Sequence, residues 1–544
     1  MNPIGKSKEL FDELSRINKM AYADTVHLAN HVLSKTPCCG MWERYERNIP
    51  PPQFTRLQVA FKVMRTWIVH AAVIGLMMLA RLAQLRTGMN NVRRINKKIH
   101  KFTLVDVFIL INKVLDEKKF KDPYLPGLTD ALQKKGYNVA ILARFYGTRN
   151  PRSLRRAFAI LKKNNIPIIT EYELFTAADW LDLIKFGFIF PIRTLSLVGK
   201  LEREEQLSRF SSRKSDLNQE CYSPLAYISA SLIQCLGQNY LSGEARRLAA
   251  KRLAKILPPD SRIIGWYENQ TVDKCFYRGL ADAGAEFSTI GAQLFTWPAE
   301  LLNNHADLAD GLHRAVPETV LVNGPYFLPA PSRQEEDQTG FSVEVPGLKP
   351  YIPYPDGPEY RIGPSLRYKD LFETEIDPDP DAPVLMLLSY HREETERVLA
   401  FAKPLAEKGV KLAIRFHPAT NLQEFKHMLP VNYSLASGPL QSVMREASMV
   451  IGSGSGTLAE AVCMGLPVIA VKAKDGTGLN YLPDYGKGEL WECISSVEEF
   501  QAASEKLLEA LKSSKTSRQE RINAFRSLLF TKPDEEKIIQ AFEL

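Results

Sequence analysis

At 544 residues the chain is too long for one ordinary hydrophobic core, and its length predicts two to four domains. Hydrophobic residues make up 45% of it and charged residues 24%, which excludes wholesale disorder, a fibrous repeat and a polytopic membrane protein. The formal net charge of +8 is unevenly distributed, because the segment from Arg47 to Val105 has no Asp or Glu and carries +11. The other residues together therefore carry −3.

The place of the basic residues points to a membrane surface rather than to nucleic acid. A nucleic-acid-binding domain normally spreads its basic side chains over the surface that meets the phosphates. A basic stretch that flanks apolar sequence is typical of contact with anionic lipids. Since the start of the chain lacks the apolar core of a signal peptide, we expect a cytoplasmic protein, peripheral on the inner face of the cytoplasmic membrane.

An apolar run lies inside the basic segment. Residues Thr66 to Ala80 carry no formal charge and are bounded by Arg65 and Arg81. A spanning helix needs about 20 apolar residues, so this run is slightly too short to span. The favoured interpretation is a helix in the bilayer interface, with a buried core helix and a true span as alternatives. Residues 1–100 are accordingly expected to form a basic, helical, membrane-associating extension.

Beyond that extension, short apolar runs alternate with helical patterns. Strands separated by helices imply parallel βαβ units, so residues 101–331 are expected to form a Rossmann-like domain. Its helices are predicted over 126–135 and 151–163. Its strands are predicted at 103–111, 138–143, 166–170, 262–267, 285–290 and 319–322.

A second α/β series is predicted over residues 384–544. It follows a stretch, 332–383, that is rich in proline and acidic residues and is taken as a linker. Helices are expected at 393–408, 458–464 and from 496 to 511 onward, and the final ones either pack on this domain or cross back to the first. Strands are expected at 384–389, 410–416, 449–452 and 467–471. The fold class is therefore α/β, with two Rossmann-like domains facing across a cleft and ligands beyond the carboxyl ends of the strands.

A glycine- and serine-rich loop is the strongest motif. An apolar strand ends at Gly452 and a helix begins at Leu458. Glycines let the backbone approach a ligand closely, and the free N–H groups at a helix start favour an anion. The hydroxyls supply further hydrogen-bond donors, and one of them is expected to cap the helix. The loop, made of Ser453, Gly454, Ser455, Gly456 and Thr457, is thus predicted to bind a phosphate or diphosphate.

The residues around this loop narrow the choice of ligand. The Gly-Lys-Ser/Thr ending of a Walker A loop is absent, and the strand after the helix ends on Val471-Lys472 rather than on the acidic residue of a nicotinamide site. Glu460 lies in the first turn of the helix. A carboxylate there either accepts hydrogen bonds from ribose hydroxyls or only interacts favourably with the positive end of the helix dipole.

The run Gly-Ser-Gly-Thr-Leu-Ala-Glu-Ala, followed by Met-Gly-Leu-Pro-Val-Ile, resembles the donor-binding signature of GT-B glycosyltransferases, including bacterial enzymes that build surface glycans. In that family the loop holds the donor phosphate and the glutamate holds its ribose. The resemblance implies these roles for Ser453 to Thr457 and for Glu460, and it implies a GT-B fold.

A second motif, Leu412 to Thr420, is a strand that delivers Arg415, His417 and Pro418 to the same domain. A histidine fixed by a proline donates to phosphate oxygens or to a base, and the arginine adds charge. The pair resembles the His-Pro motif of bacterial sialyltransferases, capsule Kdo transferases and teichoic-acid glycerophosphotransferases. That resemblance implies a cytidine-nucleotide donor.

A third motif follows the strand that ends at Trp266-Tyr267. Glycosyl transfer needs a carboxylate to take the proton of the acceptor hydroxyl or to stabilise positive charge on the sugar, and Glu268 is predicted to be that residue. The acceptor is predicted to contact Asn269, Gln270, Lys274 and Arg367. Tyr-Glu-Asn-Gln, with the later Gly-Pro-Ser-Leu-Arg-Tyr, resembles a group of bacterial surface-carbohydrate biosynthesis proteins. Glu171 and Glu173 are alternative carboxylates.

No metal site is predicted. The seven cysteines are scattered without zinc-ligand spacing, and Asp377 to Asp381 alternates with proline as an extended linker does. No cofactor is expected beyond a nucleotide-sugar co-substrate.

Together these features predict a metal-independent GT-B glycosyltransferase of lipopolysaccharide, O-antigen or capsule synthesis. The expected donor is CMP-Kdo-like, with a UDP-sugar as the alternative, and the acceptor is a surface glycan or glycolipid. A CDP-polyol phosphotransferase of the same fold and a non-catalytic nucleotide-binding scaffold are the competing functions.

Overall fold

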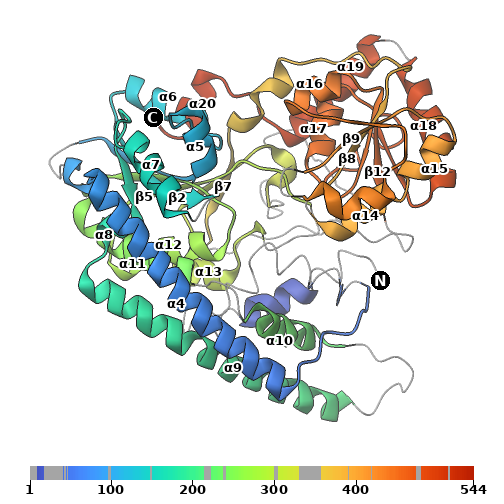
Figure 1. The fold of residues 1–544 in the computed structure, drawn as a ribbon. Coiled ribbons are helices and arrows are strands. Elements are labelled where there is room, and N and C mark those ends of the chain that lie inside the picture. Colours follow the sequence, from blue (N-terminus) through green and yellow to red (C-terminus); the bar gives the residue numbers. More distant parts are fainter. Residues whose placement is uncertain are drawn as a thin grey trace, which may run out of the picture.

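The structure is a computed structural model that describes residues 9–17, 41, 44–45, 47–95, 100–147, 150–212, 222–236, 241–298, 304–329, 357–389, 391–417, 420–472, 480–512 and 515–544. Two parallel β-sheets, each covered by helices, form two domains (Figure 1). The predicted fold class, α/β with two Rossmann-like domains, is confirmed by these sheets.

The first sheet has seven strands in the order β3-β2-β1-β4-β5-β6-β7, all paired in parallel. Its inner strands are almost fully buried, as expected for a parallel sheet covered on both faces. The strands are β1 (Phe102–Leu110), β2 (Asn138–Tyr146), β3 (Ile168–Thr170), β4 (Arg262–Trp266), β5 (Ser288–Gln293), β6 (Thr319–Val322) and β7 (Glu359–Ile362).

Strand β7 corrects the predicted linker. Residues 332–383 were expected to connect the domains, but Glu359–Ile362 adds an edge strand to the first sheet, with Thr319 of β6 opposite Glu359. The segment is short, polar and half-exposed, so it lacks the apolar pattern by which buried strands are recognised. The 3-10 helix η4 (Leu366–Phe372) follows it and carries Arg367.

Helices cover both faces of the first sheet and form a large helical insertion between β3 and β4. Some of them begin with an asparagine or serine N-cap followed by proline at the first helical position, as the sequence leads one to expect. The helices are α5 (Ile111–Glu117), α6 (Leu128–Lys134), α7 (Pro151–Leu161), α8 (Glu171–Leu174), α9 (Ala177–Ser212), α10 (Pro224–Cys235), α11 (Leu241–Ile256), α12 (Thr271–Asp282) and α13 (Leu308–Leu312).

The second sheet has six parallel strands in the order β10-β9-β8-β11-β12-β13. The inner four were predicted, whereas the edge strands β10 and β13 were not. The strands are β8 (Val384–Leu387), β9 (Leu412–Arg415), β10 (Tyr433–Leu435), β11 (Met449–Gly452), β12 (Val468–Val471) and β13 (Trp491–Ile494). Their helices are α14 (Arg392–Leu399), α15 (Ala402–Glu407), α16 (Leu440–Arg445), α17 (Thr457–Met464) and α18 (Val497–Leu511).

The last helices connect the two domains. Helix α19 (Lys515–Leu529) packs on α17 of the second domain and on η3 (Pro325–Phe327) of the first. Helix α20 (Glu535–Ala541) crosses back to α6, and the chain end is held there by Arg262, which donates to the Phe542 carbonyl at 2.8 Å. One hydrophobic cluster includes residues of both domains, so the domains are packed against each other.

The apolar run lies in α4 (Arg56–Thr87), a 32-residue helix that includes the flanking Arg65 and Arg81. It packs on α7, α8, α9 and α11, and Figure 1 shows it lying along the first domain beside α9. Few of its side chains are buried, namely Thr66, His70, Ala80, Ala83 and Gln84. The helix is therefore neither a separate extension nor a core helix, because one face is anchored to the domain and the other is exposed.

Specific polar contacts fix α4 to the first domain. The Trp67 indole donates to the Phe188 carbonyl of α9 at 3.1 Å, and His70 Nδ1 lies 3.0 Å from the Gly187 carbonyl. At the other end, the buried Gln84 bonds to Glu173 and receives a hydrogen bond from Thr170 at 2.9 Å. Helix α4 is the one described helix that is long and apolar enough to cross a membrane.

Candidate functional site

The loop after β11 meets the loop after β5, so strand ends of the two domains come together. Gly456 lies so close to Thr296 of the first domain that a Cβ at position 456 would overlap the Thr296 hydroxyl. Tyr368, in η4 and nine residues after the first residue of β7, bonds to the same Thr296. Because ligands of such sheets bind beyond the carboxyl ends of strands, this contact marks the place where a shared site is expected.

The Gly/Ser loop has the backbone geometry that its glycines suggest. Gly454 adopts a left-handed φ of 56°, and Gly452 packs against the Leu387 carbonyl of the neighbouring strand. Helix α17 begins at Thr457, and Ser455 accepts a hydrogen bond from the Thr457 backbone N–H at 3.3 Å. The Ser455 and Thr457 hydroxyls lie 2.7 Å apart and are both part-buried. The loop therefore presents two hydroxyls and the start of a helix at one point.

The Ser453 side chain, by contrast, makes its hydrogen bonds to other residues of the second domain. Its side chain is buried, bonds to the Glu394 carboxylate of α14 and lies 2.7 Å from the Val471 carbonyl. Glu394 also pairs with Arg397 at 3.0 Å. The prediction that Ser453 contacts donor phosphate is therefore corrected, because its hydroxyl holds the loop against α14 and β12.

Glu460 lies on the first turn of α17, as predicted. Burial raises the pKa of Glu460 to about 7, and the positive charge of Arg367 opposes this rise. Glu460 in turn contributes to raising the pKa of Tyr368, after the larger effect of burial. Arg367 and Tyr368 belong to the first domain and Glu460 to the second, so this group spans the domain boundary.

Glu268 lies at the first-domain side of the same group. The Trp266 indole donates to Glu268 Oε1 at 2.7 Å, and the Gln270 amide donates to Oε2 at 2.6 Å. The Trp266 ring packs on Tyr124 at 4.9 Å between centroids, and the Arg367 guanidinium lies 5.8 Å from the same Tyr124 ring. Burial raises the pKa of Tyr124, Arg367 opposes the rise and Glu268 adds to it.

Three predicted residues from distant parts of the chain thus lie within range of electrostatic interaction with one another or with Tyr124. The charges of Glu268 and Arg367 both affect the pKa of Tyr124, and the charge of Arg367 also affects the pKa of Glu460. We call Tyr124, Glu268, Arg367, Glu460 and residues 455–457 the interdomain site. It combines a carboxylate from the first domain with an arginine, a helix start and a second carboxylate, which are groups suited to proton transfer and to stabilising negative charge.

Two further predictions for the Glu268 loop are corrected. Asn269 is buried, adopts φ 53°, accepts a hydrogen bond from the Tyr267 hydroxyl and donates to the His305 carbonyl at 2.8 Å. Lys274 is buried with its ammonium 2.6 Å from Asp310. Both side chains stabilise the loop from inside the domain, so they do not face an acceptor. Gln270 remains part-buried and bonded to Glu268.

The His-Pro motif lies on the second sheet, one strand away from the Gly/Ser loop. Leu387 of β8 has Arg415 of β9 opposite it on one side and Gly452 of β11 on the other, so all three strands end at the same level. His417 is exposed just beyond β9, and Arg415 donates to the Gly438 carbonyl at 2.9 Å. Pro418 lies outside the described residues.

The alternative carboxylates have other roles. Glu173 accepts backbone N–H groups of residues 91 and 92, and burial raises its pKa to about 7. Glu171 pairs with Arg246 at 3.1 Å. Both lie in α8. Among the described residues no group of three His, Cys, Asp or Glu side chains is placed to hold a metal ion.

Three residues of the interdomain region were not predicted. Tyr124 and Thr296 follow a helix and a strand as ordinary loop residues, and nothing in the local sequence distinguishes them. Trp266 is different, because it stands two residues before Glu268 and so points the same way along an extended chain. That spacing is the one sequence feature from which its contact with Glu268 was predictable.

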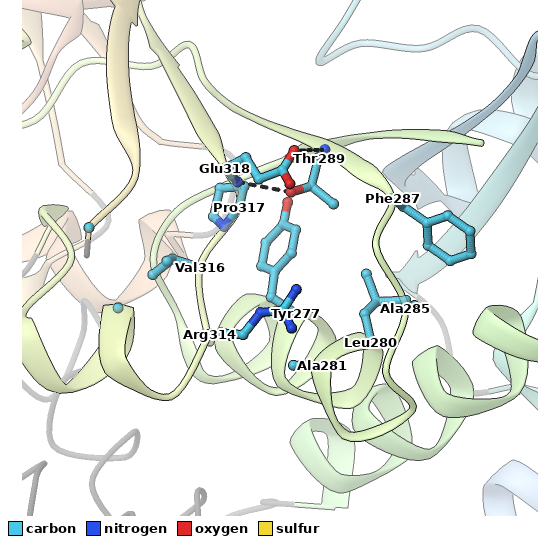
Figure 2. Close-up of a pocket in the computed structure, with 12 residues that line it drawn as sticks. Tyr277, Leu280, Ala281, Ala285, Phe287, Thr289, Arg314, Val316, Pro317 and Glu318 are labelled. Atoms are coloured by element: carbon cyan, nitrogen blue, oxygen red, sulfur yellow. Dashed lines mark hydrogen bonds between the residues drawn. The ribbon is translucent and has the colours of Figure 1, made fainter. Parts of the chain in front are cut away.

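A cavity of about 300 Å³ lies elsewhere on the first domain (Figure 2). It is lined by Tyr277, Arg314 and the bonded pair of Thr289 and Glu318, which stand at the starts of β5 and β6. None of the predicted site residues lines it. Because Thr289 and Glu318 stand at the starts of their strands, the cavity is at the amino-terminal edge of the sheet. The interdomain site is at the opposite edge.

Comparison with known proteins gives similarities of fold at low identity. No protein-family profile and no curated protein matches the chain. Among solved structures, α,α-trehalose 6-phosphate synthase from Burkholderia multivorans covers 81% of this chain and 95% of its own, at 12% identity and a TM-score of 0.38. The calicheamicin glycosyltransferase CalG4 covers 82% of this chain and 98% of its own, at 12% identity and a TM-score of 0.40. MurG from Acinetobacter baumannii covers 78% of this chain and 99% of its own, at 13% identity and a TM-score of 0.34. At 12–13% identity and TM-scores below 0.5, these similarities assign no activity to this chain.

Proposed function

We propose that the protein is a metal-independent GT-B glycosyltransferase that moves a sugar from a nucleotide-sugar donor to a bacterial surface glycan or glycolipid. The observation that carries this proposal is the meeting of Glu268, Arg367 and Glu460 at the domain boundary, next to the start of α17. A lone carboxylate or a lone helix start has many uses. Their combination across two Rossmann-like domains is what sugar transfer requires.

The second domain supplies the donor side. The N–H groups at the start of α17 and the hydroxyls of Ser455 and Thr457 stabilise the donor phosphate, whose negative charge increases as the glycosidic bond breaks. Glu460 accepts hydrogen bonds from the ribose, and His417 lies at the level of the base or phosphate. Arg367 adds the positive charge that the phosphate or an acidic sugar needs.

The first domain supplies the acceptor side. The acceptor oxygen forms a bond to the anomeric carbon, and the bond from that carbon to the phosphate oxygen breaks. The electron pair of the broken bond stays on the nucleotide phosphate. Glu268 takes the hydroxyl proton as general base, and the hydrogen bonds from Trp266 and Gln270 fix its two oxygens in place.

The donor is proposed to be CMP-Kdo-like. The His-Pro pair favours a cytidine monophosphate, and Arg367 suits the carboxylate of an acidic sugar. A UDP-sugar is the alternative, and a panel of donors distinguishes the two by whether CMP or UDP is released. The absence of turnover with every sugar nucleotide, tested with lipid extracts as acceptor, contradicts the proposed activity.

The role of Glu268 is tested with Glu268→Gln. This variant keeps the size and shape of the side chain but removes the base, so the transfer rate is expected to fall by about 10²–10⁴-fold while nucleotide binding stays within twofold of wild type. Glu286→Gln, at an exposed position of the same domain, is the matched control. A Glu268→Gln protein with wild-type transfer would mean that another group is the base.

The competing functions are separated by the same variants. A CDP-polyol phosphotransferase would release CMP and transfer a phosphopolyol, and it usually needs a histidine base in the first domain. Of the described histidines there, His70 is buried, His305 and His313 are part-buried, and His100 pairs with Asp260 at the surface. A scaffold would retain its cellular phenotype in Glu268→Gln.

The protein is further proposed to lie on the membrane through the outer face of α4. That face exposes apolar side chains along about 48 Å of helix, at a rise of 1.5 Å per residue. The helix has no acidic residue, and its cations include Arg56, Arg65 and Arg86. Because α4 is packed on four other helices, it is suited to lie in the interface rather than to span. The exposed apolar side chains are Leu57, Phe61, Met64, Trp67, Ile68, Met78, Leu79, Leu82 and Leu85.

Membrane binding is tested by sedimentation with vesicles of phosphatidylglycerol and phosphatidylcholine. Ile68→Glu removes a buried apolar contact with lipid, worth about 1.5–3 kcal/mol, so binding should weaken at least about tenfold. Ala159→Glu, on the exposed side of α7, is the control. Point variants are preferable to deletion of residues 1–100, because deletion would uncover the residues against which Ala83 and Gln84 are buried.

A further inference from the structure

A cavity of about 290 Å³ lies between α4 and the first sheet. Its volume lies just below the range of drug-sized small-molecule sites, about 300–1,000 Å³. One wall is apolar and comes from the inner face of α4, through Val73, Leu76, Met77 and Ala80. The other wall is polar and is made by Arg144, Glu171, Tyr172, Ser242 and Arg246. A cavity with two such walls suits an amphiphilic ligand.

The polar wall carries no net positive charge. Arg144 donates to Asp106 at 3.0 and 2.8 Å and to Asp273 at 2.7 Å. Arg246 pairs with Asp106 and with Glu171. Three carboxylates thus face two guanidinium groups, so a phosphate would meet no uncompensated cation here. Hydrogen-bonding groups without an excess of positive charge suit an uncharged polyhydroxyl group instead.

One donor of this wall is left without a partner. Arg246 is 2% exposed, and within the described part of the chain its Nε–H has no hydrogen-bond acceptor. Burying such a group without a partner costs free energy. A ligand hydroxyl in the cavity is the kind of group that would satisfy it. This observation is independent of the shape of the cavity.

The cavity also shares its wall with the Glu268 loop. Arg144 donates to the Trp266 carbonyl as well as to Asp273. The second oxygen of Asp273 accepts the backbone N–H groups of Glu268 at 3.0 Å and Gln270 at 3.1 Å. An occupant that contacts Arg144 is therefore one residue away from the loop that holds the proposed base.

We propose that this cavity binds the head of a neutral glycolipid, with the sugar against Arg246 and Glu171 and the start of the alkyl chain along the inner face of α4. The outer face of the same helix is the one proposed to meet the bilayer, so a lipid-borne ligand would arrive beside the cavity. This inference rests on the proposed function, because it names the chemical class of the acceptor.

The test uses the full chain without donor and a defined amphiphile. The probe is n-octyl β-D-glucopyranoside below its micelle concentration, compared by calorimetry with D-glucose, which lacks the chain, and n-octyl phosphate, which carries an anionic head. Saturable binding of the glucoside at one site is expected, with at least tenfold weaker binding of the other two. Tighter binding of octyl phosphate overturns the proposal.

Two variants locate the binding. Val73→Trp fills the cavity from α4, and Ser242→Trp blocks it from an exposed position of α11, where a large side chain is compatible with folding. Each should weaken binding of the glucoside at least tenfold, and Ala159→Trp on the exposed side of α7 should not. Wild-type binding by folded Ser242→Trp protein overturns the proposal even where Val73→Trp fails to fold.

The failure of this inference and that of the proposed function are distinguishable. Glu268→Gln should bind octyl glucoside as the wild type does, since the variant leaves the cavity unchanged. If no sugar nucleotide is turned over but the glucoside binds in the cavity, the transfer reaction is wrong and the glycolipid site stands. If transfer occurs but both tryptophan variants bind the glucoside normally, the acceptor enters elsewhere.

Discussion

Lys274 provides the sharpest test of structure against sequence. The sequence suggested that it contacts the acceptor, whereas the structure buries it with Asp310, with side-chain exposures of 2% and 0% and an Nζ to Oδ2 distance of 2.6 Å. The change Lys274→Met keeps the volume and removes the ammonium. Asp310 retains the Asp307 backbone N–H at 3.2 Å but loses the charge that neutralises it.

The magnitude follows from breaking a buried ion pair on one side. Such a change costs about 3–5 kcal/mol, because the remaining charge has lost its counter-ion in a medium that solvates it poorly. For a domain of this size each kcal/mol lowers the melting temperature by roughly 2–4 °C, so the first domain should melt about 6–20 °C lower. The double change Lys274→Met with Asp310→Leu should recover most of that loss, since neither charge is then left alone.

The assay combines calorimetry with acceptor kinetics below the melting temperature. A buried ammonium touches no substrate, so the folded Lys274→Met protein should keep its acceptor KM within about twofold, well under the tenfold change that 1.4 kcal/mol of lost binding produces. A variant with wild-type stability and a strongly raised acceptor KM would refute this reasoning. It would restore the role that the sequence suggested.

Three further outcomes are expected. Gly456→Ala introduces a Cβ that overlaps the Thr296 hydroxyl, so it should destabilise the domain contact by about 1–3 kcal/mol and weaken nucleotide binding. Adding Thr296→Ala should restore the stability and the nucleotide binding. A double variant that is as unstable as the single one contradicts this contact. Since burial raises the pKa of Glu460 from 4.5 to about 7, the folded protein keeps a proton that the unfolded chain releases, and stability should fall as the pH rises from 4.5 to 7. Glu460→Gln should remove that part of the pH dependence, and parallel melting curves for the two proteins across this window would argue against it. Arg144→Met leaves Asp273 without its guanidinium partner, so it should lower the free energy of unfolding by about 3–5 kcal/mol and lower kcat more than it raises the donor KM. An unchanged urea unfolding curve would show that the hydrogen bonds of Arg144 do not hold the Glu268 loop.

The sequence was sufficient where a local pattern carries the information. The strands at 319–322 and 449–452 were predicted to the residue, because buried parallel strands are continuous apolar runs. The Gly/Ser loop was recognised for the same reason, since glycine and hydroxyl residues before a helix have a direct backbone meaning. Edge strands β7, β10 and β13 were missed, because a half-exposed strand of three or four residues has no such pattern.

Only the tertiary structure decided which polar side chains face a ligand. Glu268, Asn269 and Lys274 lie within seven residues and look equally functional in the sequence, yet two of them are buried and bonded inside the domain. Their orientation depends on His305 and Asp310, which are distant in the chain. The same holds for α4, whose charge pattern indicated a membrane but whose anchored face is set by α7, α8, α9 and α11. Local chemistry thus determined the elements and the types of site residue, whereas the packing of distant elements decided which of those residues meet at the domain boundary.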